Sequence, residues 1–452
     1  MAPPLVLRRI LGLGFGLAMV FGGTVGVGIL RLPGTLAAAL GDPTIIVLFW
    51  ILGGAYALLG AVSVSELAAM LPQAGGFYVY ARRAFGNGAG FAVGWADWIN
   101  NVATLAYAPI TAMTFLVGLW PSLAPYAKLG AVLIIMSFTA LHWVGLSLGS
   151  SLTRIISCAI GLMMSIVVIG CFWAPPAAGV SAPLPSSAAS LPLVSMAMAS
   201  VLVTAFRAVL LTYDGWYSPI YLAEENTDPA RTLPRALIGG TLVVIVLYVL
   251  INIGFLRVLP LPVLASSALP AADAARVVFP RGGAVLVTVI SLTTVLSLIN
   301  AVLLMTPRVL FAIGRDGFFT AKAAAVSAGG TPRLALALSS AAAVALILTG
   351  TFEQIIALAT VLFLLVYIAT YVAVFVLRRR EPDMPRPFRA FGFPFTTGIV
   401  CLGCVLVLLA ALIEDLRSAA AAAVLLIACA PLYAWIARRK RRELARAAAA
   451  AI

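Results

Sequence analysis

Long apolar segments, each able to cross a membrane as a helix, recur along this chain and are separated by short polar connections. A helix needs about 20 mainly apolar residues to span the hydrocarbon layer. Hydrophobic residues make up 63% of the 452 residues and charged residues 10%, whereas a soluble domain is about half apolar and about a quarter charged. The excess apolar surface must face lipid. The sequence therefore predicts an all-α integral membrane protein with one transmembrane domain, residues 1–452.

Twelve apolar segments are long enough to be counted as candidate transmembrane helices. Their predicted ranges are 10–40, 44–70, 90–119, 127–149, 154–173, 199–222, 236–256, 283–312, 333–350, 354–377, 394–413 and 419–437. The first is too long for one straight helix. The connections are rich in proline, glycine and charge, and no separate soluble domain is predicted.

Basic residues are distributed unevenly between the two sets of connections. An even number of spans places both chain ends on one side, which then carries most of the lysines and arginines, including the clusters 378–380 and 438–442. The connections on the other side hold only Lys128, Arg257, Arg276, Arg281 and Arg417. By the positive-inside rule, we expect a multi-pass cell-membrane protein with both termini in the cytoplasm. The net charge of +14 is then explained by the basic residues of the cytoplasmic connections. No nucleic-acid partner is expected.

Two spans contain residues that interrupt a helix. Four glycines lie within residues 22–28, ahead of Pro33, and each costs about 1 kcal/mol in a helix relative to alanine. The sixth span combines Asp214, Gly215 and Pro219. Non-helical backbone is tolerated at membrane depth only where it is buried in protein or lines a cavity. Close packing of helices through small residues is the alternative explanation of the glycines.

Unwound backbone at these two places would suit a zwitterion. The N–H groups that open the second half of the first span favour a carboxylate, and the exposed carbonyls of the sixth span, with Asp214, favour an ammonium group. The two interruptions lie five spans apart. Since five is odd, the corresponding halves of the chain would have inverted topology, as in transporters with a midplane site.

Four motifs, in this order and spacing, make the chain similar to the amino acid–polyamine–organocation (APC) superfamily of permeases, and within it to the bacterial and L-type amino acid transporter branch. They are Gly26–Ile29 with Pro33, Ser65–Gly86, Tyr213–Ala236 and Arg308–Gly317. The resemblance implies a LeuT-like, five-plus-five inverted repeat with broken helices 1 and 6 and two further helices. The repeats would cover residues 10–173 and 199–377, and the two further helices 394–437.

The resemblance also implies a central substrate site. The substrate carboxylate would meet the unwound first span, and its ammonium group the sixth, while the third span contributes two residues four positions apart on one helical face. The residues expected at this site are Thr24, Val25, Gly26, Val27, Gly28, Ile29, Asp97, Asn101, Leu211, Thr212, Tyr213, Asp214, Gly215 and Trp216.

Three positions depart from the pattern of the relatives. Leu211 stands where many carry an aromatic gate, so gating or substrate size would differ. Met163 stands where proton-coupled or exchanging relatives have a lysine in the fifth span, and that span contains no lysine. Tyr217 replaces the glutamate of the arginine/agmatine and polyamine antiporters, which argues against that substrate class.

Charged side chains inside spans are costly unless they are paired or hydrated, by at least about 2.5 kcal/mol at a helix centre. Arg31 and Arg207 fall in outer halves of spans, where they would attract carboxylates, pair with Asp97 or Asp214, or reach toward the interface. Glu66 and Arg308 both approach the cytoplasmic side, and we expect them to form a structural or gating pair.

The coupling ion is open between a proton and sodium. Asp97 and Asp214 are the carboxyl groups able to titrate, since the single histidine, His142, lies at a span end. Sodium would use hydroxyl oxygens of the eighth span, unless these bond to their own helix. They are those of Ser291, Thr293, Thr294 and Ser297. No cofactor and no metal site is expected, because all five cysteines lie in apolar segments.

The leading hypothesis is a secondary transporter of amino acids, most of all neutral ones. A permease or exchanger for other organic amines such as polyamines is the alternative within transporters. A channel or a sensor on the same scaffold is the alternative from another class, although a channel would favour a continuous polar pore. An enzyme is not expected, because the sequence contains no HExxH, GxSxG or P-loop pattern.

Overall fold

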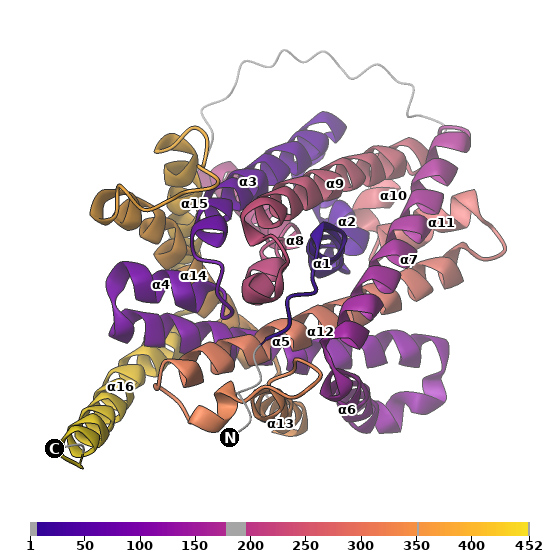
Figure 1. Ribbon diagram of the computed structural model, residues 1–452. Coiled ribbons are helices and arrows are strands. Elements are labelled where there is room, and N and C mark those ends of the chain that lie inside the picture. Colours follow the sequence, from indigo (N-terminus) through magenta and orange to yellow (C-terminus); the bar gives the residue numbers. More distant parts are fainter. Residues whose placement is uncertain (1–6, 178–195, 350–351, 451–452) are drawn as a thin grey trace.

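The computed structural model describes residues 7–177, 196–349 and 352–450, and every extended regular element in these ranges is helical (Figure 1). The first half of the chain contains α1 Leu13–Thr24, α2 Gly28–Leu40, α3 Pro43–Met70, α4 Phe77–Phe85, α5 Asn87–Leu119, η1 Pro121–Tyr126, α6 Ala127–Val144, α7 Leu146–Trp173 and α8 Met196–Thr212. The second half contains η2 Ser218–Glu225, α9 Pro229–Val258, α10 Leu261–Ser266, α11 Pro270–Val278, α12 Gly283–Arg315, η3 Ala321–Ala324, α13 Arg333–Thr349, α14 Phe352–Arg380, α15 Phe395–Glu414 and α16 Leu416–Ala450.

Helices long and apolar enough to cross a membrane dominate the described residues. Nine meet that criterion singly, and α1 with α2 make a tenth as one span bent by 44°. Two predicted spans correspond to shorter apolar helices, Val201–Thr212 and Arg333–Thr349. The protein is therefore a helical, multi-pass membrane protein, as the apolar pattern predicts.

One predicted boundary is wrong. The sequence places a connection at residues 150–153, between the fourth and fifth spans, but α7 runs unbroken from Leu146. The hydroxyl of Ser150 donates to the Ser147 carbonyl and that of Thr153 to the Gly149 carbonyl. Because these polar side chains bond to their own helix, they do not end it.

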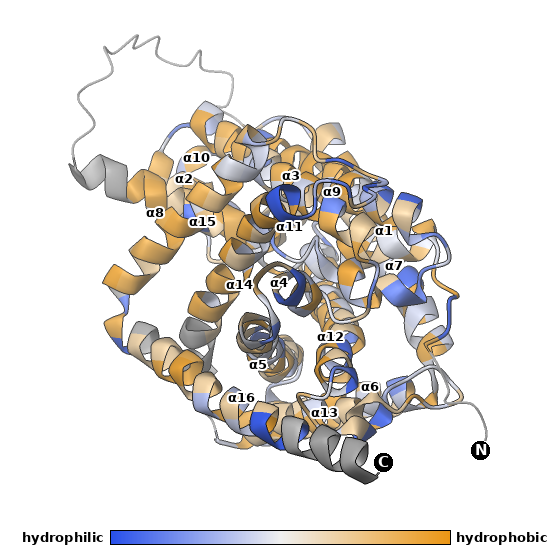
Figure 2. Cartoon of the chain, turned by 60° about the vertical axis from the view of Figure 1, so that its left-hand side comes forward, coloured by the Kyte–Doolittle hydropathy of each residue, from blue (hydrophilic) through white to orange (hydrophobic). Residues whose placement is uncertain are grey.

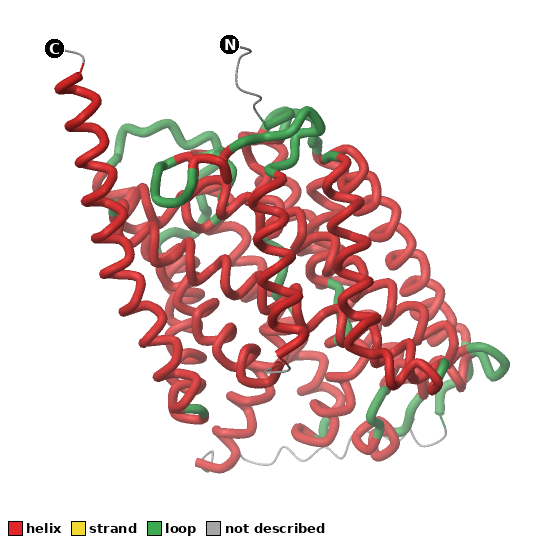
Figure 3. The backbone as a smooth tube through the Cα atoms, turned by 90° about the horizontal axis from the view of Figure 1, so that it is seen from below, coloured by secondary structure: helices red, strands yellow, loops and turns green. Residues whose placement is uncertain are grey.

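Both ends of the described chain lie at the same end of the molecule (Figure 3). We call this end the terminal face and the other end the opposite face. Figure 2 shows hydrophobic residues along most of the length of the helices, with hydrophilic residues mainly near loops and helix ends. This distribution fits helices that are surrounded by lipid along their length and meet water at both ends.

Long helices packed side by side form the core. α5 lies along α12, α3 along α9, and α1 between α7 and α9. Aromatic rings fill the centre of the α3–α9 pair, where Trp50, Tyr213 and Tyr248 pack with centroids 4.9–5.9 Å apart. The last two helices are peripheral, because α15 and α16 pack chiefly on α14, α3 and α5. This frame leaves the two interrupted helices in the middle of the bundle.

Candidate functional site

The first interruption lies between α1 and α2, where Val25–Val27 leave the helical path. The Thr24 carbonyl, freed by this break, accepts a hydrogen bond from the Tyr248 hydroxyl at 2.9 Å. The same hydroxyl lies 3.3 Å from the Thr212 carbonyl, at the end of α8. One tyrosine of α9 thus holds carbonyls of both interrupted helices. Tyr248 is not among the residues predicted from the sequence, where its only signal is a phenol in the middle of an apolar span.

The second interruption follows α8, and the chain turns through Tyr213–Tyr217 before η2 begins at Ser218. Gly215 has a φ of +105°, and a Cβ there would overlap the Gly23 carbonyl. A Cβ on Gly23 would in turn meet the Ser218 hydroxyl at 2.7 Å. Glycine is therefore required on both sides because the two breaks touch each other. The backbone leaves the helical path at both predicted interruptions, at Val25–Val27 and at Tyr213–Tyr217.

A cavity of about 500 Å³ lies against both breaks. Its wall combines unwound backbone with side chains of α5, α12 and α14. The lining residues are Gly23, Thr24, Gly26, Val27, Gly28, Asn100, Asn101, Thr104, Tyr107, Ala108, Thr111, Leu211, Thr212, Asp214, Gly215, Tyr217, Ser218, Thr294, Val295, Leu298, Ala301, Val302, Met305, Ala359, Thr360 and Phe363. Asp214 is the single charged residue among them. From α5 the wall takes residues between 100 and 111, which lie around the middle of that helix.

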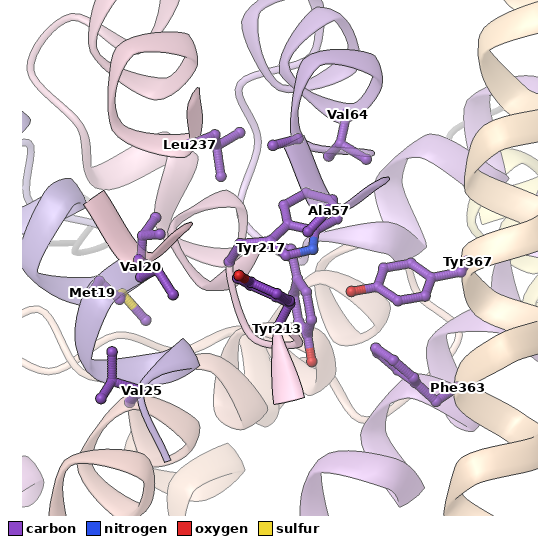
Figure 4. Close-up of a cluster of buried hydrophobic side chains, with 14 of the residues drawn as sticks. Met19, Val20, Val25, Ala57, Val64, Tyr213, Tyr217, Leu237, Phe363 and Tyr367 are labelled. Atoms are coloured by element: carbon purple, nitrogen blue, oxygen red, sulfur yellow. The ribbon is translucent and has the colours of Figure 1, made fainter. Parts of the chain in front are cut away.

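Asp214 sits in the wall between two cavities. One carboxylate oxygen accepts a hydrogen bond from the Tyr367 hydroxyl at 2.7 Å, and Figure 4 shows Tyr367 pointing toward Tyr217 from α14. A smaller cavity of about 50 Å³ lies behind Asp214, lined in part by Arg207, Trp216 and Cys404. Leu211, Asp214 and Phe363 line both spaces, so they form the partition between them.

Asp97 lies beneath the main cavity and does not line it. It precedes Asn101 by one turn of α5, about 6 Å along the axis toward the terminal face. Its side chain is 1% exposed, and one oxygen accepts hydrogen bonds from Asn101 at 3.0 Å and from the Tyr221 hydroxyl at 2.7 Å. The expected placement of Asp97 and Asn101 on one helical face is right, but only Asn101 reaches the cavity.

Ion pairs close the bundle at the terminal face. Glu225 lies between the guanidinium nitrogens of Arg308, at 2.9 and 3.0 Å, and both side chains are at most 2% exposed. Five further pairs tie the loops together. They are Arg315 with Glu224, Arg82 with Asp316, Arg83 with Glu381, and both Arg378 and Arg386 with Glu66.

The expected pair of Glu66 with Arg308 is wrong. Glu66 at the end of α3 accepts two hydrogen bonds from Arg378 and one from the Ala390 backbone N–H, whereas Arg308 binds Glu225. Both residues are buried and paired as expected of charges inside a membrane protein. Their partners differ because α14 and η2 pack closer to them than they do to each other, which the order of residues does not reveal.

The other predicted residues separate into lining and supporting positions. Val25 and Ile29 are buried in the core at no more than 1% exposure. Tyr213 donates to the Trp50 carbonyl at 2.9 Å, away from the main cavity. Arg31 is exposed, and Met163 is half-buried against the core of α7. Pairing of Asp97 with an arginine is not observed, since its described partners are Asn101 and Tyr221.

Sequence reasoning missed most of the polar wall of the cavity. Asn100, Thr104 and Thr111 of α5 and Thr360 of α14 all line it. A repeat of polar residues every three or four positions along 100–111 was the available signal. Of the four hydroxyls considered for sodium, those of Ser291, Thr293 and Thr294 donate to carbonyls of their own helix. These bonds follow the alternative in which the hydroxyls serve α12 itself.

Comparison with known proteins gives consistent matches over nearly the whole chain. The family model described as amino acid permease matches residues 16–435. The serine/threonine exchanger SteT of Bacillus subtilis is 25% identical over 440 residues, which cover 96% of this chain and 98% of the exchanger. The b(0,+)-type amino acid transporter 1 of Mus musculus is 26% identical, with 90% and 84% covered. The Asc-type amino acid transporter 1 of Mus musculus is also 26% identical, with 85% and 73% covered.

Proposed function

The chain belongs to the amino acid permease family, and we propose that it is a secondary transporter that carries neutral amino acids across the cell membrane by alternating access. The observation that carries this proposal is the cavity wall. It joins two unwound backbone segments to a single carboxylate, Asp214, and its remaining lining is neutral. A zwitterion with an uncharged side chain matches that distribution of charge.

The α-carboxylate of the substrate is placed at the start of α2. Backbone N–H groups at a helix N-terminus attract anions, and Gly26 and Gly28 keep the approach free of side chains. The ammonium group is placed at the end of α8, on the carbonyls of Leu211 and Thr212 and on Asp214. The substrate side chain then points toward Asn101 and Thr104 of α5.

The finer topology is also part of the proposal. Twelve spans would form two inverted repeats over residues 10–173 and 199–377, followed by 394–437. The two interruptions, in the first and sixth predicted spans, support this arrangement because they touch each other at Gly23 and Gly215. With the basic clusters inside, the terminal face is cytoplasmic. The buried pair of Arg308 and Glu225 then lies on the cytoplasmic side, which fits a state whose inner side is closed.

Polyamines are a poorer fit. A polycation needs several acceptors of positive charge along its length, and the cavity offers one carboxylate. A channel is disfavoured by the terminal face, where the buried pair of Arg308 and Glu225 lies within packed helices. The serine/threonine exchanger among the relatives makes small hydroxyl amino acids the first substrates to test.

The test is uptake of radiolabelled amino acids into proteoliposomes, with Gly26→Val as the blocking variant. A Cβ at Gly26 meets no atom closer than 3.9 Å, so valine fits the fold and projects into the cavity. Gly398→Val is the matched control, because a Cβ there has no neighbour within 4 Å and lies outside the cavity. We expect saturable uptake in wild type and in Gly398→Val, and none in Gly26→Val. Absence of uptake of every amino acid by wild type would refute the proposal.

A further inference from the structure

A carboxyl group with one unused oxygen lies beneath the cavity floor. Asp97 is 1% exposed, and both of its hydrogen bonds, from Asn101 and Tyr221, go to the same oxygen. The other oxygen, Oδ2, is buried and has no hydrogen-bond partner among the described residues. Asp97 is not a lining residue, so the substrate proposed above does not account for it.

The described residues supply no cation to Asp97. Nine basic or titratable groups on the elements packed around α5 are bound to other residues: Arg82 to Asp316, Arg83 to Glu381, His142 to Asn300, Arg308 to Glu225, Arg315 to Glu224, Arg333 to the Trp143 carbonyl, Arg378 to Glu66, Arg380 to the Ala84 carbonyl and Lys440 to the Asp316 carbonyl. The titratable groups beside Asp97 are tyrosines. Tyr221 donates to it, and the ring of Tyr217 lies 6.1 Å from that of Tyr221.

An isolated negative charge in such a place is far more costly than a neutral polar group. Burying an unpaired carboxylate costs many times more than burying a hydroxyl or a neutral carboxyl. The unused Oδ2 is the position at which a proton removes that cost. Asp214 differs, because it lines two cavities and is exposed to whatever enters them.

Asp97 also lies across a boundary between elements. It is fixed on α5, which packs along α12, whereas its donor Tyr221 belongs to η2, the continuation of the interrupted α8. Alternating access requires the interrupted helices to move relative to the helices packed around them. Any such motion changes the distance between the Tyr221 hydroxyl on η2 and the Asp97 carboxyl group on α5.

We propose that Asp97 is a proton-binding site and that this permease carries one proton inward with each substrate molecule. The proton binds Asp97 from the outer solution before the cavity closes, and it leaves to the inner solution when η2 moves away. A neutral zwitterion and one proton cross together, so each cycle moves one positive charge. This inference rests on the proposed transport function and deepens it by naming the coupling ion and its carrier.

The experiment measures uptake of the best amino acid of the panel into proteoliposomes with a pH gradient, acid outside, and the membrane potential clamped at zero. With one proton per substrate, each pH unit sustains an accumulation of about tenfold. We expect this accumulation in wild type, together with substrate-driven acidification of the lumen reported by a trapped pH dye. Exchange of labelled against unlabelled substrate at equal pH is measured on the same vesicles.

Asp97→Asn keeps the shape and both acceptor bonds of the side chain but cannot bind a proton. We expect it to lose accumulation and lumen acidification while retaining measurable exchange. Asp97→Glu restores a carboxyl group and is expected to recover part of the pH response. Asp42→Asn is the matched control, because asparagine caps a helix as aspartate does and Asp42 only accepts from the N–H groups of Thr44 and Ile45 at the start of α3.

The outcomes separate the two proposals. Accumulation by Asp97→Asn equal to that of wild type would overturn the assignment of the proton to Asp97. Exchange by wild type without any response to the pH gradient would overturn proton coupling and leave the transport function standing. If Asp97→Asn does not assemble, two measurements decide the question. They are lumen acidification by wild type and lumen acidification by Asp97→Glu. A wild type that moves no amino acid overturns both proposals.

Discussion

Two aspartates lie within the transmembrane bundle, and the structure treats them in opposite ways. Asp214 stands in an interrupted helix, lines two cavities and accepts one described hydrogen bond from a side chain, that of Tyr367. Asp97 stands in an unbroken helix, beneath the floor, and two donors share one of its oxygens. The same side chain is therefore available to a ligand in one place and to no more than a proton in the other. The difference between the two aspartates is whether a cavity reaches the carboxyl group.

Another buried carboxylate, Glu225, shows the effect of an ion-pair partner. Glu225 is as deeply buried as Asp97, at 0% exposure, but both of its oxygens are bound by Arg308. Glu225 is therefore a structural part of the closed terminal face. Asp97 has no such partner, so its protonation state is free to change.

Removing the guanidinium of Arg308 tests how much the ion pair with Glu225 contributes to the stability of the protein. Arg308→Met leaves a buried carboxylate without a partner, and breaking such a pair costs about 3–5 kcal/mol. We expect a large loss of thermal stability in detergent, measured by fluorescence-detected size exclusion. Arg308→Met combined with Glu225→Gln should recover a substantial part of it. Equal stability of Arg308→Met and wild type would contradict the role given to the pair.

Neutralising the carboxylate in the wall tests its contact with the ammonium group. A hydrogen bond to a charged group contributes about 1.5–3 kcal/mol, so Asp214→Asn should raise KM about 10- to 100-fold. KM is measured by initial uptake at equal pH on the two sides. Asp273→Asn, in the short helix α11 and outside the cavity, is a matched control with an expected wild-type KM. An unchanged KM in Asp214→Asn would place the ammonium group elsewhere.

Deleting the donor to Asp214 should have a smaller effect. Tyr367→Phe removes one hydrogen bond, and the net contribution of such a bond is about 1 kcal/mol. We expect KM to change about fivefold. Tyr371→Phe is the control on the same helix, since that ring packs beside Tyr367 at 5.8 Å and does not line the main cavity. Similar effects of both changes would indicate a general packing defect in α14.

The smallest expected effect on substrate binding is at Asp97. In Asp97→Asn the amide oxygen still accepts from Asn101 and Tyr221, and no atom of the residue lines the cavity. We expect KM at equal pH to stay within about threefold of wild type, or about 0.65 kcal/mol. Equilibrium exchange measures it. A change as large as that of Asp214→Asn would erase the distinction between the two aspartates.

Much of the architecture could be predicted because it depends on local properties. Apolar length marks the membrane-spanning segments, and the dense glycines near residue 26 together with Asp214–Gly215 mark both interruptions. The error at residues 150–153 arose because hydroxyl groups near a span end look like a connection, although they can bond to their own helix. A sequence pattern does not distinguish these two uses of serine and threonine.

The substrate-binding role of the predicted site residues stays a prediction, and the structure shows which of them line the cavity. Thr24, Gly26, Val27, Gly28 and Asp214 line it, whereas Asp97, Val25 and Ile29 do not. Two tyrosines that shape the site, Tyr248 and Tyr367, lie 224 and 153 positions from the residues they bind, Thr24 and Asp214. No periodicity within a span reports which distant span will lie beside it.

The sequence by itself determined that this chain crosses a membrane, where its helices are interrupted and which residue types are available there. These follow from transfer free energies and backbone preferences, which belong to each segment alone. The tertiary structure decided that Glu66 binds Arg378, that Arg308 binds Glu225, and that only one of two aspartates meets the cavity. The physical reason is that a charge in a membrane protein is governed by what packs against it, and packing joins segments hundreds of residues apart.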